Sequence, residues 1–426
     1  MSVGIKVVKG MKDVLPTEMG GWNYLENKIK SLFQCYGYQE IRMPVVEQTE
    51  LFKRAIGEVT DIVEKEMYTF VDKGGDSLTL RPEGTAQCAR AVMESGLLRN
   101  QSLRLWYFGP MFRRENPQKG RYRQFYQFGI EAFGLPGPDV DVEQLLMMSR
   151  LWHQLGLDDK IALQLNSLGT LAERTRYREA LVAYFSSCKT LDEDSQRRLN
   201  TNPLRILDSK NPHMQETIRN APSLIDFLER DSLHHFEAIQ GMLKQAGVKF
   251  EVNPRLVRGL DYYTHTVYEW VTTELGAQGT VCAGGRYNDL VSQLGGQPTD
   301  AVGFSLGVER VLMLLTDNQL IVEHQPIDVY MVADGDKAQT EILLLAEKLR
   351  EAMPSLKILT NCGKGSFKSQ FKRADKCGAR FAIILGEEEL NTHTIGIKAL
   401  REDLPQQSLS FDQIIAYLNK MTTQKG

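Results

Sequence analysis

The part of the chain that most constrains its fold is the segment from residue 103 to residue 134, which is the most strand-like in the sequence. Aromatic and aliphatic residues fill 105–108 and dominate 122–133, and the polar residues 116–120 (Asn-Pro-Gln-Lys-Gly) separate the two runs. Two runs of strand-forming residues on either side of a turn-forming sequence predict an antiparallel hairpin. We therefore expect two antiparallel strands joined by a polar loop.

Length and composition bound the other possibilities. A chain of 426 residues is longer than one hydrophobic core usually serves, so two or three domains are expected. The hydrophobic content of 42% and the charged content of 25% are ordinary for a soluble globular protein. The sequence contains no apolar run of about 18 residues and its first residues do not form a signal peptide, so we expect a cytoplasmic protein with no membrane contact.

Charge and cysteine spacing argue against two further classes. The formal net charge of -3 is not that of a protein covered in positive potential, so any nucleic-acid contact must come from local patches. The cysteines lack a Cys-x-x-Cys pair or a matching histidine spacing, so neither a zinc site nor a disulfide framework is indicated. We expect free thiols and no metal held by protein side chains.

Changes in pattern divide the chain. Residues 169–248 are helical and charged, with helices expected at 174–185 and 224–243, and they interrupt strand-rich sequence on both sides, which indicates an inserted helical module. After residue 325 strands and helices alternate, which predicts a separate, partly parallel α/β domain. The expected organisation is an α+β domain of residues 1–168 and 249–325, a helical insert 169–248 and an α/β domain 326–426. Within the last domain we expect strands 327–332, 356–360 and 380–385 and helices 337–352 and 367–376.

The N-terminal region predicts a helix followed by a strand. Apolar residues recur at helical spacing from residue 18 to residue 36, and Gly37 stands where a C-terminal cap belongs. The strand expected at 38–46 contains Pro44, which cannot donate a ladder hydrogen bond and so indicates a sheet edge or a subunit boundary.

One face of the hairpin carries hydrogen-bonding groups. Side chains alternate across a strand, so Arg121, Phe125, Gln127 and Glu131 share a face, while the opposite face is apolar from residue 126 onward. If no bulge intervenes, Glu115 pairs with Arg121 and Arg113 joins the same face. Phe125 offers a stacking surface, the arginines offer phosphate contacts and Glu115 can accept from an amine, so this face could bind a nucleotide. A salt-bridged sheet face is an equally good interpretation of these residues alone.

Two further segments carry cations beside glycine. The sequence 258–263 (Arg-Gly-Leu-Asp-Tyr-Tyr) precedes a strand at 264–270 and presents Arg258 to something anionic. Residues 303–310 predict a strand that enters a helix with Arg310 near its start. The same stretch matches a hydrolase nucleophile elbow at Ser305, but only His324 and His393 follow it, so we disfavour a serine hydrolase.

A basic cluster lies in the last domain. Its residues are Lys364, Lys368, Lys372, Arg373, Lys376 and Arg380, opposed only by Asp375. A solvated helix face and an RNA-facing patch explain the cluster equally well. The neighbouring sequence is not a phosphate-binding P-loop, because Ile358 stands where that motif needs its first glycine.

Taken together, these residues resemble the class II aminoacyl-tRNA synthetases, specifically the histidyl-tRNA synthetases of the bacterial type. The resemblance covers nearly the whole chain. Its three class motifs are similar to 37–44, 113–133 and 303–310, and the segments 258–263 and 283–287 (Ala-Gly-Gly-Arg-Tyr) resemble those that select histidine. This resemblance implies an antiparallel-sheet catalytic domain with a helical insert and a C-terminal anticodon-binding domain. It also implies a homodimer that uses ATP, with Mg²⁺ bound to it, to form histidyl-adenylate and then histidyl-tRNA.

The resemblance also implies roles for individual residues. For ATP, Arg113 bridges the α-phosphate and the substrate carboxylate, Glu115 meets the adenine amine, Arg121 holds the terminal phosphate, and Phe125 and Arg310 sandwich the base. For histidine, Glu83, Thr85 and Gln127 bind the α-amino group, Glu131, Tyr262 and Tyr263 read the imidazole, and Arg258 contacts the α-phosphate at the reacting centre. For tRNA, Asn116 and Gln118 approach the acceptor end, the insert clamps the acceptor arm, and Lys368 and Lys372 lie on the basic patch. No tightly bound prosthetic group is implied.

Three positions depart from the family pattern. Asn116 stands where an arginine is usual, His265 where arginine or glycine is usual, and Asn288-Asp289 where Asp-Gly is usual. The alternative to a ligase is the noncatalytic regulatory subunit of ATP phosphoribosyltransferase, which resembles the same catalytic domain. That alternative is disfavoured because the arginines and residues 326–426 are all present.

Overall fold

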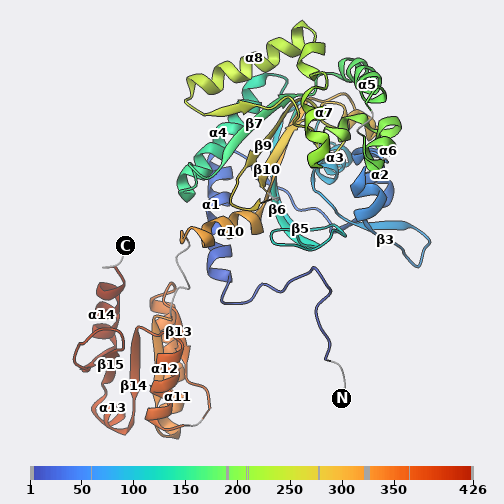
Figure 1. The fold of residues 1–426 in the computed structure, drawn as a ribbon. Helices are drawn as coiled ribbons and strands as arrows, with labels where there is room; N and C mark the ends of the chain where they lie inside the picture. Colours follow the sequence, from blue (N-terminus) through green and yellow to red (C-terminus); the bar gives the residue numbers. More distant parts are fainter. Residues whose placement is uncertain are drawn as a thin grey trace. The chain divides into compact units, whose positions relative to one another are not determined.

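The computed structural model describes residues 4–58, 60–188, 191–207, 209, 211–276, 279–320, 327–363 and 365–423. The chain divides into two compact units, Met1–Val322 and Glu323–Gly426 (Figure 1). The expected boundary at residues 325 and 326 lies outside the described residues, as do His324 and Lys364. Residues 169–248 belong to the first unit.

An eight-stranded sheet forms the centre of the first unit, with the order β1-β5-β6-β11-β10-β9-β7-β8. Its strands are β1 (Gln39–Glu40), β5 (Leu103–Phe112), β6 (Gln124–Phe133), β7 (Ala162–Ser167), β8 (Phe250–Val252), β9 (Thr264–Val271), β10 (Thr280–Arg286) and β11 (Ala301–Gly307). The strands from β5 to β7 in this order are antiparallel to their neighbours, and the edge pairs β1·β5 and β7·β8 are parallel. The predicted antiparallel sheet and its hairpin, β5 and β6, are confirmed.

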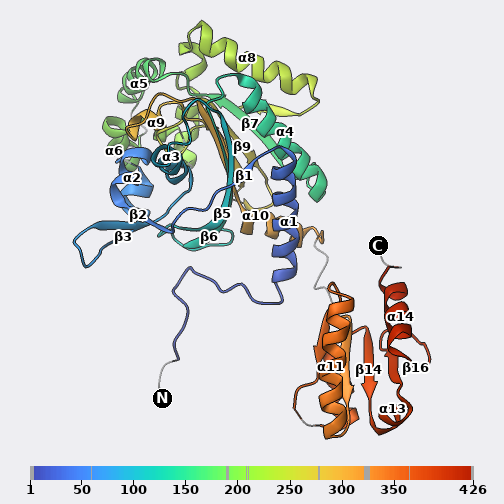
Figure 2. The same ribbon diagram turned by 180° about the vertical axis from the view of Figure 1, so that it is seen from behind.

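Strand alternation divides the side chains between two cores. On β5, Trp106 packs with Phe128 and Ile130 of β6 on one face, while Leu105 and Tyr107 enter the core of the other face. The first face is covered by α1 (Met19–Cys35), α4 (Pro138–Leu155), α8 (Arg230–Gln245) and α10 (Val308–Asp317). The second is covered by α2 (Thr49–Ile56), α3 (Thr85–Glu94) and α5 (Leu171–Ser186), and the two opposite views agree on this layering (Figures 1 and 2).

The strand predicted at 38–46 is wrong in extent. The chain leaves the large sheet after the two residues of β1 and next pairs at β2 (Val46–Gln48) in a small antiparallel sheet with β4 (Ser77–Leu80) and β3 (Tyr68–Val71). Pro44 has no N–H to extend the ladder, and its carbonyl accepts from Gln87 Nε2 at 2.7 Å. Gly37 adopts φ +76° after α1, as the predicted cap requires.

The helical insert is more broken than its sequence pattern predicts. It contains α5, α6 (Glu193–Thr201), α7 (Gln215–Arg219) and α8, together with the short turns η2 (Pro203–Ile206), η3 (Pro212–Met214) and η4 (Leu224–Phe227). The single helix expected at 224–243 is wrong, because Leu228 and Glu229 are extended before α8 begins. Glu173 stabilises this break, since its carboxylate accepts from the Glu229 amide and the Ser232 hydroxyl.

The second unit has the predicted partly parallel α/β fold. Its sheet has the order β13-β12-β14-β15-β16, in which the first three strands are parallel and the last two pairings are antiparallel. The strands are β12 (Val329–Ala333), β13 (Ile358–Thr360), β14 (Phe381–Leu385), β15 (Ile395–Ala399) and β16 (Gln407–Leu409), and the helices are α11 (Asp336–Ala352), α12 (Phe367–Lys376), α13 (Glu387–Thr392) and α14 (Phe411–Thr423). Across the described residues of both units, no helix is long and apolar enough to cross a membrane.

Candidate active site

One pocket in the first unit gathers most of the predicted site residues. Its walls come from β6, β10, β11, the start of α10 and the loops before α3, after β5 and before β9. Predicted residues that line it are Glu83, Arg113, Glu115, Arg121, Phe125, Gln127, Arg258, Tyr262, Tyr263 and Arg310. Thr85 and Glu131 lie fully buried beside these residues, whereas Asn116 and Gln118 are exposed in the loop between β5 and β6. Lys368 and Lys372 are exposed on α12 of the second unit.

The loop between the hairpin strands places Arg113 against Phe125. The guanidinium of Arg113 lies 5.4 Å from the centroid of the Phe125 ring, and its Nε donates to the carbonyl of Pro82 at 2.9 Å. Burial lowers the pKa of Arg113. Because an arginine pKa starts above 12, the side chain remains a cation that is held in one orientation.

The predicted register holds to the end of the two strands but not across the turn, because the backbone of Arg121 pairs with Gln118 rather than with Glu115. Phe112 pairs with Gln124, and beyond that pair Arg121 forms an ion pair with Glu115. Arg121 also lies 3.8 Å from Glu66, and its side chain is 36% exposed. The two groups that the sequence assigned to different parts of a nucleotide therefore neutralise each other in this structure.

Arg310 enters the pocket from the first turn of α10. Its Nε donates to the carbonyl of Gly120 at 3.0 Å, and its Nη1 donates to the carbonyl of Thr280 at 2.5 Å. Burial, together with the nearby charges of Arg113 and Arg121, lowers the pKa of Arg310 to about 10. The accumulation of positive charge at this end of the pocket is therefore strong enough to perturb an arginine.

Arg258 is held by a carboxylate that the sequence analysis did not single out. Its guanidinium forms an ion pair with Glu269 of β9 and lies 5.6 Å from the centroid of the Tyr263 ring. Thr280 donates to the second oxygen of Glu269 at 2.8 Å. The Arg258 side chain is 15% exposed, so it reaches the pocket while most of it is buried.

A second part of the pocket contains the buried carboxylate of Glu83, with that of Glu131 beside it, and is here called the carboxylate end. Glu83 accepts from the amides of Thr85 and Ala86 at 2.7 and 2.9 Å, at the start of α3, and from the Tyr262 hydroxyl at 3.4 Å. A carboxylate is favoured at this position by the helix dipole. Burial nevertheless raises the pKa of Glu83.

Glu131 is the most deeply buried acid of the site. It accepts from Thr85 Oγ1 at 2.7 Å, from the Tyr107 hydroxyl at 3.1 Å and from the Tyr287 hydroxyl. Burial raises its pKa to about 8 in spite of these donors. The hairpin face that carries Glu131 was expected to hold an exposed ring, but Phe125 is partly buried and the face lines the pocket.

Two glycines make room for this network. A methyl carbon at Gly129 would lie 2.2 Å from the Tyr107 ring, and one at Gly303 would lie 1.9 Å from Oε2 of Glu131. Gly129 stands opposite Tyr107 on β5, and Gly303 stands opposite Glu131 on β6. Each side chain therefore lies across the neighbouring strand where that strand has no side chain.

The segment 283–287 contributes in two ways. Tyr287 donates to Glu131, so it belongs to the carboxylate end of the pocket. Arg286 is 1% exposed and forms an ion pair with Asp141 of α4 at 2.7 Å, so it stabilises the fold outside the pocket.

The nucleophile-elbow interpretation of Ser305 is wrong. Ser305 lies within β11, where it pairs with Ala283 and Gly129, rather than at a turn between a strand and a helix. Its hydroxyl lies 3.4 Å from the hydroxyl of Tyr107. His393 belongs to the second unit, and His324 is outside the described residues.

Sequence reasoning missed Tyr107 and Glu269. A lone glycine in an apolar strand signals a close approach, so Gly129 could have indicated Tyr107. A lone carboxylate in the aromatic and β-branched strand 264–271 could have indicated Glu269. Among the described residues, no three His, Cys, Asp or Glu side chains are placed to hold a metal ion.

The basic cluster of the second unit is less uniform than its sequence. Arg373 donates to Asn361 at 2.8 Å, and Arg380 donates to the Met421 carbonyl at 2.9 Å and lies 3.6 Å from Asp328. Lys368, Lys372 and Lys376 are exposed. The cluster therefore combines two hydrogen-bonded arginines, of which Arg373 is exposed on α12, with three exposed lysines on the same helix.

Comparison with known proteins gives a consistent result. Residues 10–311 match the family described as Histidyl-tRNA synthetase, and residues 328–421 match the Anticodon binding domain. A curated histidine–tRNA ligase of Hydrogenovibrio crunogenus is 55% identical over 425 residues, which are 100% of both chains. The crystal structure of apo histidyl-tRNA synthetase from S. aureus is 36% identical, with a TM-score of 0.81 over 97% of this chain and 100% of that one.

A more distant structure shares the fold. It is described as an ATP phosphoribosyltransferase regulatory subunit/histidyl-tRNA synthetase from Bacillus halodurans. It is 21% identical, with a TM-score of 0.65 over 91% of this chain and 99% of that one. At this identity the likeness extends to the fold alone.

Proposed function

Since this chain belongs to the histidyl-tRNA synthetase family and attaches histidine to tRNA, we propose that its pocket activates histidine with ATP. A carboxylate oxygen of histidine attacks the α-phosphorus of ATP, the bond to the β-phosphate oxygen breaks, and pyrophosphate leaves. A terminal ribose hydroxyl of the tRNA then attacks the carbonyl carbon of the adenylate, and AMP leaves. Mg²⁺ enters as part of the ATP substrate.

The part of the pocket that contains Arg113, Arg121, Arg258 and Arg310, here called the cationic end, is the proposed ATP site. Arg113 bridges the α-phosphate and the carboxylate of histidine, and Arg258 neutralises the α-phosphate during attack. This assignment is supported by their burial and fixed orientation, because preorganised charge stabilises a transition state without rearrangement. Arg121 takes the terminal phosphate and Glu115 the adenine amine, so ATP binding exchanges their mutual ion pair for two ligand contacts.

Adenine is proposed to lie between Phe125 and Arg310. The support is that both residues line the pocket, and that a guanidinium and a phenyl ring offer flat faces to a base. Arg310 is already held by two backbone carbonyls, so its plane is set before the base arrives.

The carboxylate end is the proposed histidine site. Glu83 and Thr85, with Gln127, take the α-amino group, and Oε1 of Gln127 is a buried acceptor with no hydrogen bond among the described residues. Glu131, Tyr262 and Tyr263 take the imidazole. A site that hydrogen-bonds both ring nitrogens leaves buried polar groups unpaired with other amino acids, which can give about 10⁴ to 10⁵ in discrimination.

tRNA is proposed to contact three regions. The loop residues Asn116 and Gln118 meet the acceptor end, and the insert 169–248 clamps the acceptor arm as a module of the catalytic domain. The anticodon-binding unit, for which we propose the bounds 326–426, contributes Lys368 and Lys372. The support is that these side chains are exposed and polar or cationic, as phosphate contacts require.

We further propose that the enzyme is a homodimer in the cytoplasm. Apolar side chains gather on the small sheet, where Val46 is 36%, Phe70 44% and Val71 69% exposed. Such a patch suits a subunit interface. Light scattering would measure the mass, and Val71→Glu should shift it toward the monomer. A monomeric wild type would contradict the proposal.

One observation carries the assignment of the pocket. The pocket is lined by four arginines together with the buried carboxylate of Glu83, and the buried Glu131 lies beside it, which matches a substrate that carries phosphates as well as an amine and an imidazole. The test is ATP–pyrophosphate exchange with each of the twenty amino acids, for which we expect exchange with histidine alone. Absence of exchange with histidine would instead favour the noncatalytic regulatory subunit.

A further inference from the structure

The segment 192–206 of the insert lies against the outside of the pocket wall formed by the loop 258–263. We propose that Asn202 and Arg205 are positioning residues, which hold this loop in the geometry that histidine activation needs. The inference rests on the proposed function and adds two residues that contact neither substrate. The loop carries Arg258 at one end and Tyr262 and Tyr263 at the other, so its backbone sets the distance between the two ends of the pocket.

Arg205, at the end of η2, fixes the first part of the loop. Its Nη1 donates to the carbonyl of Arg258 at 3.2 Å. Its guanidinium also packs on Gly259, since a methyl carbon there would lie 3.5 Å from Nη2. The contact is made to the backbone directly behind the Arg258 side chain, so it constrains where that guanidinium points.

Asn202, between α6 and η2, fixes the middle of the loop. Its Nδ2 donates to Oδ1 of Asp261 at 3.2 Å. Asp261 is also held by α2, because its amide donates to the carbonyl of Ile56 at 3.0 Å. Its carboxylate packs over Gly57, where a methyl carbon would lie 2.6 Å from Oδ2. Asp261 is thus held between the insert and α2, one residue before Tyr262.

The insert also holds the last residue of the loop. Arg174 of α5 donates from Nη1 to the carbonyl of Tyr263 at 2.5 Å. Three side chains of the insert therefore contact the loop at residues 258, 261 and 263. From outside the insert, the backbone of this loop is held by the hydrogen bond from the Asp261 amide to the Ile56 carbonyl.

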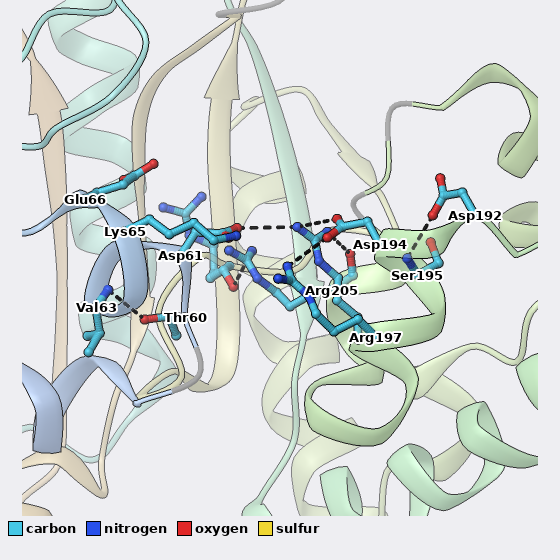
Figure 3. Close-up of polar contacts among 12 residues, drawn as sticks. Thr60, Asp61, Val63, Lys65, Glu66, Asp192, Asp194, Ser195, Arg197 and Arg205 are labelled. Carbon is cyan, nitrogen blue, oxygen red and sulfur yellow. Dashed lines mark hydrogen bonds and ion pairs between the residues drawn. The ribbon is translucent and has the colours of Figure 1, made fainter.

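The same part of the insert reaches the phosphate side of the pocket. Arg198 of α6 lies 3.5 Å from Asp61, which precedes η1 (Ile62–Glu66), and Figure 3 shows these two segments facing each other. At the other end of η1, Glu66 lies 3.8 Å from Arg121, and its carbonyl accepts from the Arg114 amide at 2.7 Å. The insert thus supports both walls of the pocket.

Placement of the loop matters because activation needs the attacking carboxylate and the α-phosphate in a fixed geometry. A displacement of about 1 Å by a residue outside the chemistry can cost about 10²-fold in rate. Loss of one of the three contacts from the insert should cost less. We therefore expect about a tenfold loss for each of the two proposed residues.

The primary test is histidine-dependent pyrophosphate exchange by Arg205→Ala in the full-length chain. We expect kcat/KM for histidine to fall about tenfold, mostly through a lower kcat because Arg258 acts on the α-phosphate, and Arg205→Lys to recover most of the loss because it keeps a donor. Arg197→Ala is the matched control, since Arg197 lies on α6 and pairs with Asp194 of its own helix at 2.8 Å. This control should stay within about twofold of wild type.

Hydrogen exchange of the backbone amides supplies a second readout that does not need activity. Amides at 259–263 should exchange faster in Arg205→Ala and Asn202→Ala than in wild type or Arg197→Ala, with no change on β6. Exchange and kinetics of Arg205→Ala that match Arg197→Ala would overturn the inference. So would an equal loss in Arg205→Lys together with a lower thermal midpoint, because that result indicates a fold defect. A wild type with no histidine-dependent exchange would refute the proposed function, while the amide readout would still decide whether Arg205 holds the loop.

Discussion

The two ends of the pocket place charge in opposite ways. At the cationic end, Arg121 and Arg258 are paired with Glu115 and Glu269, so each of these two positive charges has a carboxylate of the protein as its partner. At the carboxylate end, Glu83 and Glu131 are held by amides and hydroxyls, and burial raises the pKa of both. Two of the arginines therefore contact carboxylates of the protein, whereas the two buried carboxyl groups contact neutral hydrogen-bond donors.

Because of this difference, the arginines can respond to a ligand by exchanging one anionic partner for another, whereas Glu131 can respond to pH by gaining or losing a proton. An arginine stays ionised at neutral pH even where burial lowers its pKa, as at Arg310, so the cationic end can trade a carboxylate for a phosphate without a proton. Glu131, with a pKa of about 8, changes protonation near neutral pH. Control by pH should therefore act through buried carboxyl groups, namely Glu131 and also Glu309 at the start of α10, whose pKa burial raises to about 7.

The largest expected effect is at the cationic end. Arg258→Ala should lower the rate of histidine-dependent pyrophosphate exchange by about 10² to 10³, because it removes a fixed charge at the α-phosphate. The affinity for histidine, measured by calorimetry without ATP, should change less than the rate. The variant also leaves Glu269 buried without its cation.

The double variant Arg258→Ala, Glu269→Gln separates these two effects. It should recover stability that the single variant loses and leave the exchange rate low. Recovery of the rate together with stability would mean that Arg258 acts on the fold and not on the phosphate.

Glu131→Gln tests the carboxylate end. The folded-state pKa of Glu131 is above the ordinary value of 4.5, so below about pH 4.5 folding carries no penalty from this group. Between about pH 4.5 and pH 8 the unfolded state releases the proton while the folded state keeps it, so stability falls by as much as about 1.4 kcal/mol per pH unit. Above about pH 8 both states are ionised and the loss is complete.

The glutamine variant lacks this titration. Urea unfolding at pH 5, 6, 7 and 8 should show wild-type stability falling relative to the variant by about 2 to 4 kcal/mol across the range. Parallel stability curves for the two proteins would contradict a raised pKa. Arg258→Ala should keep the wild-type pH slope, which makes it the control from the other end.

Charge reversal at lysines outside the pocket should weaken tRNA charging without changing the chemistry at either end of the pocket. Lys368→Glu with Lys372→Glu should lower kcat/KM for tRNA charging about tenfold and weaken its salt dependence, because phosphate contacts are lost. Pyrophosphate exchange should be unchanged. Lys337→Glu with Lys348→Glu, on α11 of the same unit, is the charge-matched control. Equal losses in charging and exchange would contradict the division of labour between the units.

The smallest effect is expected for Glu115→Gln. The variant keeps an oxygen that can accept from adenine and removes the charge that pairs with Arg121, so the KM for ATP should shift by less than about fivefold. The pH dependence of stability should match wild type, in contrast to Glu131→Gln. A pH dependence altered as strongly as in Glu131→Gln would remove the distinction between the two ends.

The sequence predicted the parts of the fold that local pattern decides. Strand alternation in 122–133 and the turn before it predicted the hairpin and its shared face, on which the side chains of Glu115 and Arg121 meet. The backbone pairing of these two residues was wrong, because the turn tightens and pairs Arg121 with Gln118. The helix at 367–376 begins and ends where its pattern predicts. Pattern was insufficient at 38–46, where β1 ends at Glu40, well before Pro44. It was also insufficient at 224–243, where the distant carboxylate of Glu173 holds the break before α8.

The candidate site was predicted unevenly for the same reason. Arg113, Arg121 and Phe125 share one hairpin, so parity alone brings them together. Arg258 reaches them from the loop before β9, and its partner Glu269 follows it by eleven residues, so nothing local joins the pair. Tyr107 contacts Glu131 from a neighbouring strand, and Arg205 contacts the Arg258 carbonyl from the insert. Both pairs are far apart in the sequence and come together only in the folded chain.

The glycines at 129 and 303 have a consequence for redesign. Beside the pocket, Tyr107 packs on the backbone of β6 at Gly129, and Glu131 packs on the backbone of β11 at Gly303. In a library that varies Glu131 alone, each new side chain at position 131 must fit against the backbone of Gly303. A side chain too bulky for this space would force β6 and β11 apart. Engineering this enzyme toward another amino acid therefore calls for joint variation of β5, β6 and β11, with the glycines treated as positions to be moved rather than as fixed background.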